Sequence, residues 1–176
     1  LIPTRAVHGT LEEAAKLGSK SATIYTAGFG EGDDPKGKER GQAMKELCEK
    51  TGFVICGPNC MGSYSTGNGL WTFPTVTPLL KKGPVGLVFQ SGGSLGNWIK
   101  GASERGIGFT YAVSSGNEVS LDLVDYISFL IDDPDTSCGG RNPLCLLFLI
   151  PGLDSLLTAN VYRVTPVAPH GERTLS

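Results

Sequence analysis

The sequence predicts an α/β fold in which parallel sheets are flanked by helices. Short apolar runs alternate along the chain with amphipathic helical patterns, which is typical of parallel strands joined by right-handed crossovers. None of the runs alternates strictly between apolar and polar residues, as a strand with one solvent-exposed face would. Each run ends in small or glycine-rich residues, which suit a sharp turn at the carboxyl end of a buried strand. The expected strands are residues 21–27, 53–56, 85–89 and 109–113.

Helical periodicity between the runs supports this interpretation. In the third helical pattern, Leu95, Trp98, Ile99 and Ala102 follow the i, i+3, i+4, i+7 spacing of one helix face. The fourth pattern is equally periodic, and Ser120 stands where an N-cap would. The expected helices are residues 11–17, 36–50, 95–104 and 121–131.

Composition and charge limit the classes of protein to consider. The 176 residues are 40% hydrophobic, carry a formal net charge of −2 and include 25 glycines and 5 cysteines. This balance provides no electrostatic basis for binding nucleic acid or anionic lipid, and the longest apolar run, residues 144–150, is too short to cross a bilayer. An odd number of scattered cysteines is unlike a secreted disulfide framework. We therefore expect a cytoplasmic protein that binds neither nucleic acid nor membranes.

The best candidate binding site follows the third strand. In open parallel sheets, ligands bind at the carboxyl ends of strands, where free N–H groups and the helix dipole favour an anion. Two glycines here allow a phosphate to approach the backbone, and two hydroxyls can donate to its oxygens. The simpler interpretation is a serine N-cap on a tight turn, and the local pattern favours neither over the other. The residues concerned are Ser91, Gly92, Gly93 and Ser94.

A second loop, residues 57–62, follows the second strand. Its proline and glycines predict a rigid turn that exposes the Asn59 amide and the Cys60 thiol, although a plain turn would need no function. Cys60 has no nearby histidine to stabilise a thiolate, because the two histidines lie at positions 8 and 170. Cys56 and Cys60 also lack further ligands at zinc-like spacing. The sequence therefore predicts neither a catalytic residue nor a metal site.

The ends of the first and fourth strands give weaker signals. Residues 28–32 contain Gly-x-Gly-x-Gly, which differs from the Gly-x-Gly-x-x-Gly dinucleotide fingerprint. Residues 114–117, taken alone, are compatible with a simple turn.

The alternation of strands and helices breaks at two places. Residues 63–83 hold no convincing helix, and a structureless stretch of this length is unusual within one domain. We therefore expect a domain linker there, with a short hairpin around residues 70–73. After Thr136 the alternating pattern of the sequence is lost abruptly, so we expect residues 137–176 to be an aberrant or poorly ordered tail.

Six segments, taken together, carry a family resemblance. They are Ala-Gly-Phe-Gly-Glu at 27–31, Gly-Pro-Asn-Cys-Met-Gly at 57–62, Gly-Pro-Val-Gly at 83–86 with Gln-Ser-Gly at 90–92, Arg-Gly-Ile-Gly-Phe at 105–109, Ser-Gly-Asn at 115–117 and Asp-Asp-Pro-Asp-Thr at 132–136. Their order and spacing resemble the alpha part of the NDP-forming acyl-CoA synthetases, which include ADP-forming acetate–CoA ligase and the alpha subunit of succinyl-CoA synthetase. The resemblance covers about residues 1–136.

The resemblance implies a domain plan and a set of site residues. Residues 1–62 would be the C-terminal part of a Rossmann-like CoA-binding domain, and residues 84–136 the N-terminal part of a flavodoxin-like ligase domain. One group of residues would line the CoA site near its thiol end, namely Gly28, Phe29, Glu31, Asn59 and Cys60. The loop at Ser91, Gly92, Gly93 and Ser94 would cradle phosphate.

The resemblance also implies a reaction and partners. Family members join a small carboxylic acid to coenzyme A at the expense of ATP or GTP and release NDP and phosphate. A histidine carries the phosphoryl group, and the nucleotide binds through a nucleotide-grasp domain or beta-type subunit that is absent from this sequence. The full-length relatives imply an oligomer.

Several departures from the family bear on activity. The glycine-rich turn that holds the CoA nucleotide would precede Leu1, and Ser120 stands where many members have Asp. After Thr136 the family has a strand ending in Glu and a later histidine loop, and neither is visible; His170 stands in unrelated surroundings. We therefore expect a ligase part that is inactive alone. The alternatives are a CoA-binding regulatory module of the kind fused to protein acetyltransferases, and an α/β domain without a ligand.

Overall fold

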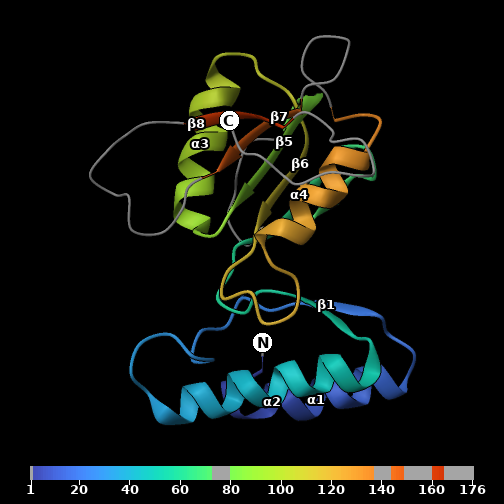
Figure 1. Cartoon of the computed structure of the whole chain (residues 1–176), viewed down its shortest axis with the longest axis vertical. Helices are drawn as coiled ribbons and strands as arrows, with labels where there is room; N and C mark the ends of the chain where they lie inside the picture. The colour runs from blue at the N-terminus through green and yellow to red at the C-terminus, as the bar shows by residue number, and fades with distance from the viewer. Residues whose placement is uncertain (1, 73–79, 137–143, 149–159, 165–176) are drawn as a thin grey trace, which may run out of the picture.

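The computed structural model describes residues 2–72, 80–136, 144–148 and 160–164, with side chains through residue 136. They form two units joined by loops (Figure 1). The first unit has a two-stranded parallel sheet and two helices. The helix α1 is Thr4–Lys16, β1 is Ser21–Thr23, α2 is Pro35–Thr51 and β2 is Val54–Cys56.

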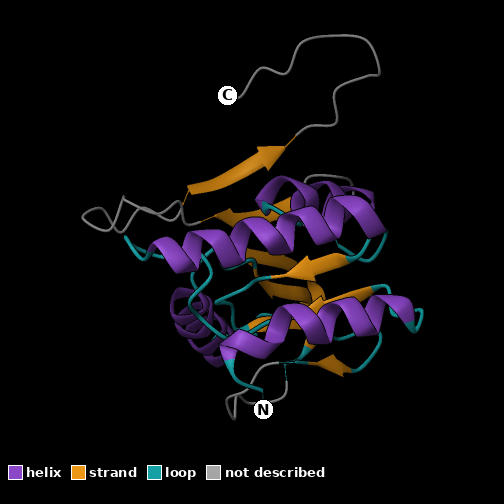
Figure 2. Ribbon diagram, turned by 90° about the horizontal axis from the view of Figure 1, so that it is seen from below, coloured by secondary structure: helices purple, strands orange, loops and turns teal. Residues whose placement is uncertain are grey.

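The second unit is built on a six-stranded sheet of order β4-β3-β6-β5-β7-β8. Its parallel centre consists of β6, β5 and β7, and β3 and β8 pair antiparallel with β6 and β7. Figure 2 shows helices on both sides of the central strands, with the strand that leads toward the C-terminus outside them. The elements are β3 (Gly62–Ser65), β4 (Leu70–Trp71), β5 (Lys82–Phe89), α3 (Gly92–Glu104), β6 (Phe109–Ser114), α4 (Leu123–Asp132), β7 (Leu144–Phe148) and β8 (Asn160–Val164).

Alternate residues of β5 face different helices, as the pleat of a strand requires. Phe89 packs in a cluster with Leu95 and Ile99 of α3, whereas Val88 packs with Leu130 of α4. The two helices therefore cover opposite faces of the sheet (Figure 1). This arrangement explains why β5 reads as a continuous apolar run: both of its faces are buried.

The predicted α/β class is confirmed, with some differences in detail. Each predicted strand and helix is present, but α1 begins at Thr4 rather than at residue 11, and β1 ends at Thr23 rather than at residue 27. The hairpin expected around residues 70–73 corresponds to the pair β3–β4 but begins earlier in the chain, whereas the antiparallel pairing of β3 with β6 was not predicted, because β3 is short and mostly polar. The sheet is mixed rather than purely parallel.

The predicted N-cap of the fourth helix was wrong. Asp122, not Ser120, caps α4: its carboxylate accepts from the Val124 N–H at 2.8 Å and the Asp125 N–H at 3.0 Å. The Asp125 carboxylate accepts in return from the Asp122 N–H at 3.0 Å, completing a capping box. The Asp122 carboxylate accepts two backbone hydrogen bonds, and its negative charge also interacts favourably with the positive end of the helix dipole. These two effects explain why the helix begins after Asp122 and not after Ser120, two residues earlier.

Strands also occur in the segments predicted as linker and tail. The hairpin β3–β4 falls within residues 62–71 and joins the second sheet through β6. Residues 144–148 pair parallel with β5, and residues 160–164 pair with residues 144–148. The rest of the predicted tail, with His170, lies outside the described residues.

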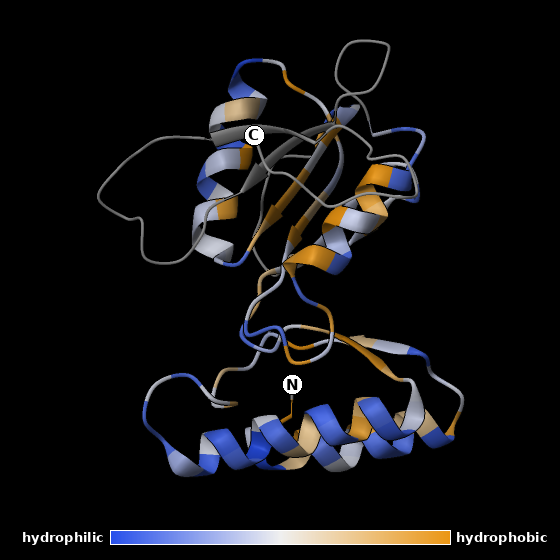
Figure 3. Cartoon of the chain, viewed as in Figure 1, coloured by the Kyte–Doolittle hydropathy of each residue, from blue (hydrophilic) through white to orange (hydrophobic). Residues whose placement is uncertain are grey.

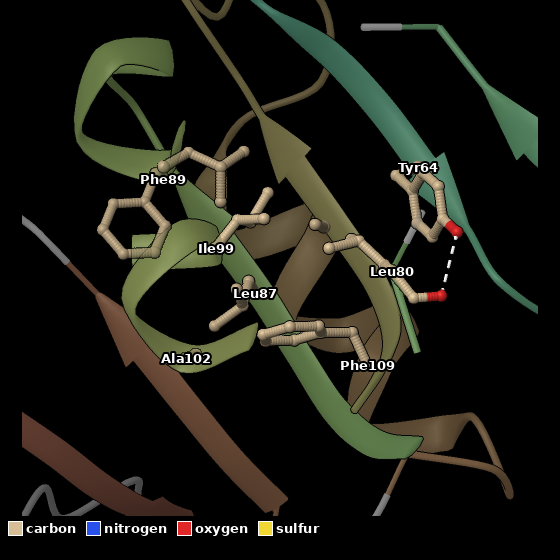
Figure 4. Packing of buried hydrophobic residues seen from close by; sticks show 9 residues of the cluster. Tyr64, Leu80, Leu87, Phe89, Ile99, Ala102 and Phe109 are labelled. Atoms are coloured by element: carbon tan, nitrogen blue, oxygen red, sulfur yellow. Dashed lines mark hydrogen bonds between the residues drawn. The ribbon is translucent and has the colours of Figure 1, made fainter. Parts of the chain in front are cut away.

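The core of the second unit lies between the sheet and α3. Apolar residues concentrate on the strands and on the inward helix faces, and polar residues on the outer faces of α1 and α2 (Figure 3). Figure 4 shows the centre of this core, where the Tyr64 hydroxyl donates to the Leu80 carbonyl at 3.3 Å. Phe89 is fully buried there and lies 6.4 Å from Trp98, ring centre to ring centre.

We expect Phe89→Ala to lower the free energy of unfolding by about 3–5 kcal/mol, because it removes a fully buried ring and leaves a cavity. Phe129→Ala is the matched control. Phe129 is 54% exposed and loses mainly one edge-to-face contact with Tyr111, so its cost should stay below about 1.5 kcal/mol. Urea denaturation measures both values. Equal losses in the two variants would show that the core has been misplaced.

Candidate functional site

Four loops at the carboxyl ends of strands meet between the two units (Figure 1). Residues 28–31 lie beyond β1, residues 57–61 follow β2, residues 90–94 follow β5, and residues 114–118 follow β6. We call these segments the loop cluster. Parallel strands bring their carboxyl ends to one edge, and hydrogen bonds then connect the loops of the two units.

Asn117 joins three of the four loops. Its backbone N–H donates to the Pro58 carbonyl at 2.8 Å. Its side-chain oxygen accepts from the Asn59 amide at 3.4 Å, and its side-chain amide donates to the Glu31 carboxylate. The backbone and side chain of this one residue therefore connect the first unit to the turn after β6.

Glu31 closes the first loop on itself. Its second carboxylate oxygen accepts from the Gly28 N–H at 2.8 Å and the Phe29 N–H at 2.9 Å. Burial raises the pKa of the Glu31 carboxyl, but the hydrogen bonds from Asn117, Gly28 and Phe29 favour the ionised form and bring the pKa below its usual value. The carboxylate is therefore a fixed negative charge that holds the loop in shape.

The turn after β5 packs directly on the turn after β2. Gly92 begins α3, and a Cβ built on it would lie 1.7 Å from the Met61 Cγ. No side chain fits in that space. Ser91 is the N-cap of α3, and its hydroxyl accepts from the Ser94 N–H at 3.4 Å. The serine cap expected as the simpler interpretation is therefore present.

Ser114 and Gln90 complete the connections. The buried Ser114 hydroxyl accepts from the Met61 N–H at 3.1 Å and donates to the Gln90 carbonyl at 3.3 Å. The Gln90 side chain donates to the Gly116 carbonyl at 3.0 Å. The loops after β2, β5 and β6 are consequently fixed relative to one another by partly buried polar contacts.

The predicted site residues differ in exposure, and Gly28, Glu31, Gly92 and Ser94 are partly buried. Asn59 is exposed and adopts a left-handed conformation with φ 55°, and Ser91 and Gly93 are exposed as well. Phe29 and Cys60 are buried, at 3% and 5% exposure. The prediction that the Cys60 thiol would be exposed was therefore wrong.

The buried Cys60 thiol points into the first unit and donates to the Ile24 carbonyl at 3.4 Å. Small residues surround it closely, because a Cβ on Gly116 would lie 2.9 Å from the Cys60 Cβ. Any contact of Cys60 with a ligand in this conformation would have to come from its backbone.

The sequence reasoning missed the central role of Asn117. The Ser-Gly-Asn motif contributes to the family resemblance and, taken alone, is compatible with a simple turn, because the partners of Asn117 lie in other loops. The contact of Cys56 with the cluster was also missed: Cys56 ends β2, and its thiol donates to the Ser114 carbonyl at 3.5 Å. The four-residue separation of Cys56 and Cys60 was the available signal.

The surface of the loop cluster suits an anion better than a cation. The N-terminus of α3 presents backbone N–H groups beside the hydroxyls of Ser91 and Ser94, and the helix dipole adds a partial positive charge. Among residues whose positions are described, no group of three or more His, Cys, Asp or Glu side chains could hold a metal ion. The helices of the same residues include none long and apolar enough to cross a membrane.

Comparison with known proteins identifies the family. Residues 82–140 match the family described as succinyl-CoA ligase like flavodoxin domain. Acetate–CoA ligase (ADP-forming) II of Archaeoglobus fulgidus is 33% identical over 141 residues, which are 79% of this chain and 21% of that protein. The chain is a relative of the NDP-forming acyl-CoA synthetases. This confirms the resemblance stated from the sequence.

Two further relatives agree with this assignment to the acyl-CoA synthetases. The alpha subunit of acetate–CoA ligase (ADP-forming) II of Pyrococcus furiosus is 37% identical over 75% of this chain and 28% of its own length. The structure of a dinucleotide forming acetyl-coenzyme A synthetase 1 of Ca. Korarchaeum cryptofilum, in complex with phosphate and ADP, superposes with a TM-score of 0.71 at 25% identity. That alignment covers 86% of this chain and 31% of the other. The chain thus spans about a fifth to a third of these relatives.

We expect Gly92→Ala to destabilise the protein by about 1–3 kcal/mol, because the added methyl group forces Met61 and its loop to move. Gly93→Ala is the matched control, since its Cβ would meet only the Ser91 hydroxyl, at 3.9 Å. Neither glycine has a positive φ, so the pair isolates packing from backbone strain. Thermal and urea unfolding provide the comparison. A neutral Gly92→Ala would mean that the two turns are not in contact.

We expect Glu31→Gln to lower the free energy of unfolding by about 1 kcal/mol at neutral pH, because charged hydrogen bonds are lost. The pKa of Glu31 is lowered in the folded state, so its contribution is present above the pKa of the unfolded chain and disappears as pH falls through the folded value. Urea unfolding at neutral pH and at about pH 3 tests this dependence. Glu39→Gln, on the exposed surface of α2, serves as the control, and an equal pH dependence in both variants would contradict the role of Glu31.

Proposed function

We propose that this chain is part of an acid–CoA ligase of the NDP-forming type and that its loop cluster binds coenzyme A and phosphate. The supporting observation is the convergence of four strand-end loops, two from each unit, through Asn117, Met61 and Ser114. A ligase of this type must hold an acyl phosphate and a thiol together. A surface shared by two units is suited to that task, because each unit can position one reactant.

The phosphate would bind at the start of α3. Ser91, Gly92, Gly93 and Ser94 offer hydroxyls and helix N-terminal N–H groups, and Gly93 and Ser91 are exposed. Such donors stabilise a multiply charged phosphoryl group without reorganisation during the reaction. The structure of the related synthetase in complex with phosphate and ADP supports a phosphate-handling role for this family.

The thiol end of coenzyme A would lie along the neighbouring turns. Residues 28–31 and 59–60 border the same loop cluster, and the exposed Asn59 amide is the group best placed to contact a ligand. Phe29, Cys60 and Glu31 would act indirectly, because the first two are buried and the Glu31 carboxylate is engaged by its own loop. These three residues would shape the turns that contact the ligand.

The complete reaction would need further parts. A phosphohistidine and a nucleotide-grasp domain or beta-type subunit would supply phosphoryl transfer from NTP, and the acid substrate would be a small carboxylic acid. One of the relatives is itself an alpha subunit, which supports such a partner. The present chain alone would bind ligands but would not catalyse ligation.

Binding can be mapped on the chain by amide chemical shifts. We expect phosphate to shift the N–H signals of Gly92, Gly93 and Ser94, and coenzyme A to shift those of residues 28–31 and 59–61 as well, because ordered N–H donors sense a bound anion directly. Asn59→Asp should weaken the binding of both about fivefold to tenfold, since a carboxylate at this position repels a phosphate. Titration with each compound, followed by two-dimensional NMR, measures the affinity.

The control for this variant is Asn68→Asp, which places the same charge on the exposed turn between β3 and β4. It should leave the affinity unchanged. Shifts confined to surface lysines, or equal weakening by both variants, would overturn the proposed site.

A further inference from the structure

Two thiols lie together beneath the loop cluster. Cys56 ends β2, and Cys60 follows after a three-residue turn. The Cys60 thiol lies 3.6 Å from the carbonyl oxygen of Cys56 and 3.4 Å from that of Ile24. The turn therefore folds Cys60 back over the end of the strand that carries Cys56.

Each sulfur also influences the other. Interaction with the Cys60 thiol lowers the pKa of Cys56 to about 7, although burial opposes this effect. Interaction with Cys56, together with burial, raises the pKa of Cys60. One sulfur is thus favoured as the thiolate and the other as the thiol, and this division distinguishes an attacking cysteine from a resolving one.

Cys48 provides a comparison within the same unit. It is buried at 8% exposure among apolar residues of α2 and its neighbours, and burial raises the pKa of its thiol. Cys56 differs in being only partly buried and in having a second sulfur beside it. Packing in the apolar core is enough to explain Cys48. It does not explain why Cys56 and Cys60 lie next to each other.

We propose that Cys56 and Cys60 form a dithiol modification site that a peroxide closes to a disulfide. The Cys56 thiolate attacks one peroxide oxygen and breaks the O–O bond, which gives a sulfenic acid and, after protonation, water or an alcohol. The Cys60 sulfur then attacks the Cys56 sulfur. Hydroxide leaves and takes the Cys60 proton as water, so two thiols and one peroxide yield one disulfide. A small dithiol or thioredoxin-type reductant reverses the reaction.

The cross-link would act on the loop cluster. Drawing the Cys60 sulfur toward Cys56 breaks its hydrogen bond to Ile24, and Cys60 is flanked by Asn59 and Met61. Asn59 contacts Asn117, and Met61 packs on Gly92 and donates to Ser114. The dithiol chemistry does not depend on the proposed ligase function, since it requires only the two sulfurs and an oxidant.

Tryptic peptides separate the relevant cysteines. Residues 51–81 contain Cys56 and Cys60 in one peptide, whereas Cys48 falls in residues 46–50. After brief treatment of the folded chain with hydrogen peroxide and blocking of free thiols, we expect the first peptide to be lighter by two hydrogens and to carry no blocking group. Cys48 should remain fully blockable. Thioredoxin with its reductase should restore both thiols.

Variants identify the attacking sulfur. In Cys60→Ser, the sulfenic acid at Cys56 has no resolving partner, so dimedone labelling of Cys56 should increase several-fold over the unaltered chain. In Cys56→Ser, neither the disulfide nor dimedone labelling at position 60 should appear. Cys48→Ser is the control and should form the disulfide at the original rate.

The rate of alkylation gives a test on the unaltered protein. At neutral pH, iodoacetamide should modify Cys56 about fivefold faster than Cys48, because a larger thiolate fraction outweighs its lower intrinsic nucleophilicity. Absence of the cross-linked peptide under conditions that leave the chain folded would overturn the proposal. So would equal labelling of Cys56 and Cys48, or a disulfide from Cys56 or Cys60 to any of the other three cysteines in place of the pair.

Discussion

The amide of Asn117 is the contact on which the loop cluster depends. It bonds to Pro58 through its backbone and to Asn59 and Glu31 through its side chain, so it spans the boundary between the two units. An isolated two-stranded sheet is only marginally stable in water. Contacts with the second unit therefore help to hold the ends of β1 and β2 in place. Loss of this amide would leave the Glu31 carboxylate with only the hydrogen bonds of its own loop.

Close backbone packing makes these contacts possible. Side chains at two glycines would collide with the opposite turn: a Cβ on Gly116 would lie 2.2 Å from the Pro58 carbonyl oxygen, and one on Gly92 would overlap Met61. Hydrogen bonds from Ser114 and Gln90 then satisfy polar groups that this packing removes from water. Glycine thus allows the backbones of neighbouring turns to approach closely, and short polar side chains form the specific hydrogen bonds between the turns. A phosphate could approach the same backbone for the same reason.

The sequence predicted the elements better than the contacts between them. Apolar runs and helical periodicity depend on near neighbours, so β5, α3 and the buried face of α3 could be predicted from local pattern alone. The antiparallel strand β3 could not, because its polar residues become buried only through pairing with β6. The partners of Asn117 and the burial of Cys60 likewise depend on loops more than twenty residues away in sequence. Asp122 could have been identified as a cap, since Asp125 three residues later completes a capping box.

The burial of Cys60 also limits how coenzyme A could approach. Its thiol is buried against the carbonyls of Ile24 and Cys56, so a bound thiol would meet the backbone of this turn and not its sulfur. The two cysteines are then available for chemistry with each other. Because Cys60 stands between Asn59 and Met61, whose side chains face Asn117 and Gly92, a change in the bonding of its sulfur would be transmitted to both halves of the proposed ligand surface. The tight packing that forms this surface would therefore also make it sensitive to oxidation.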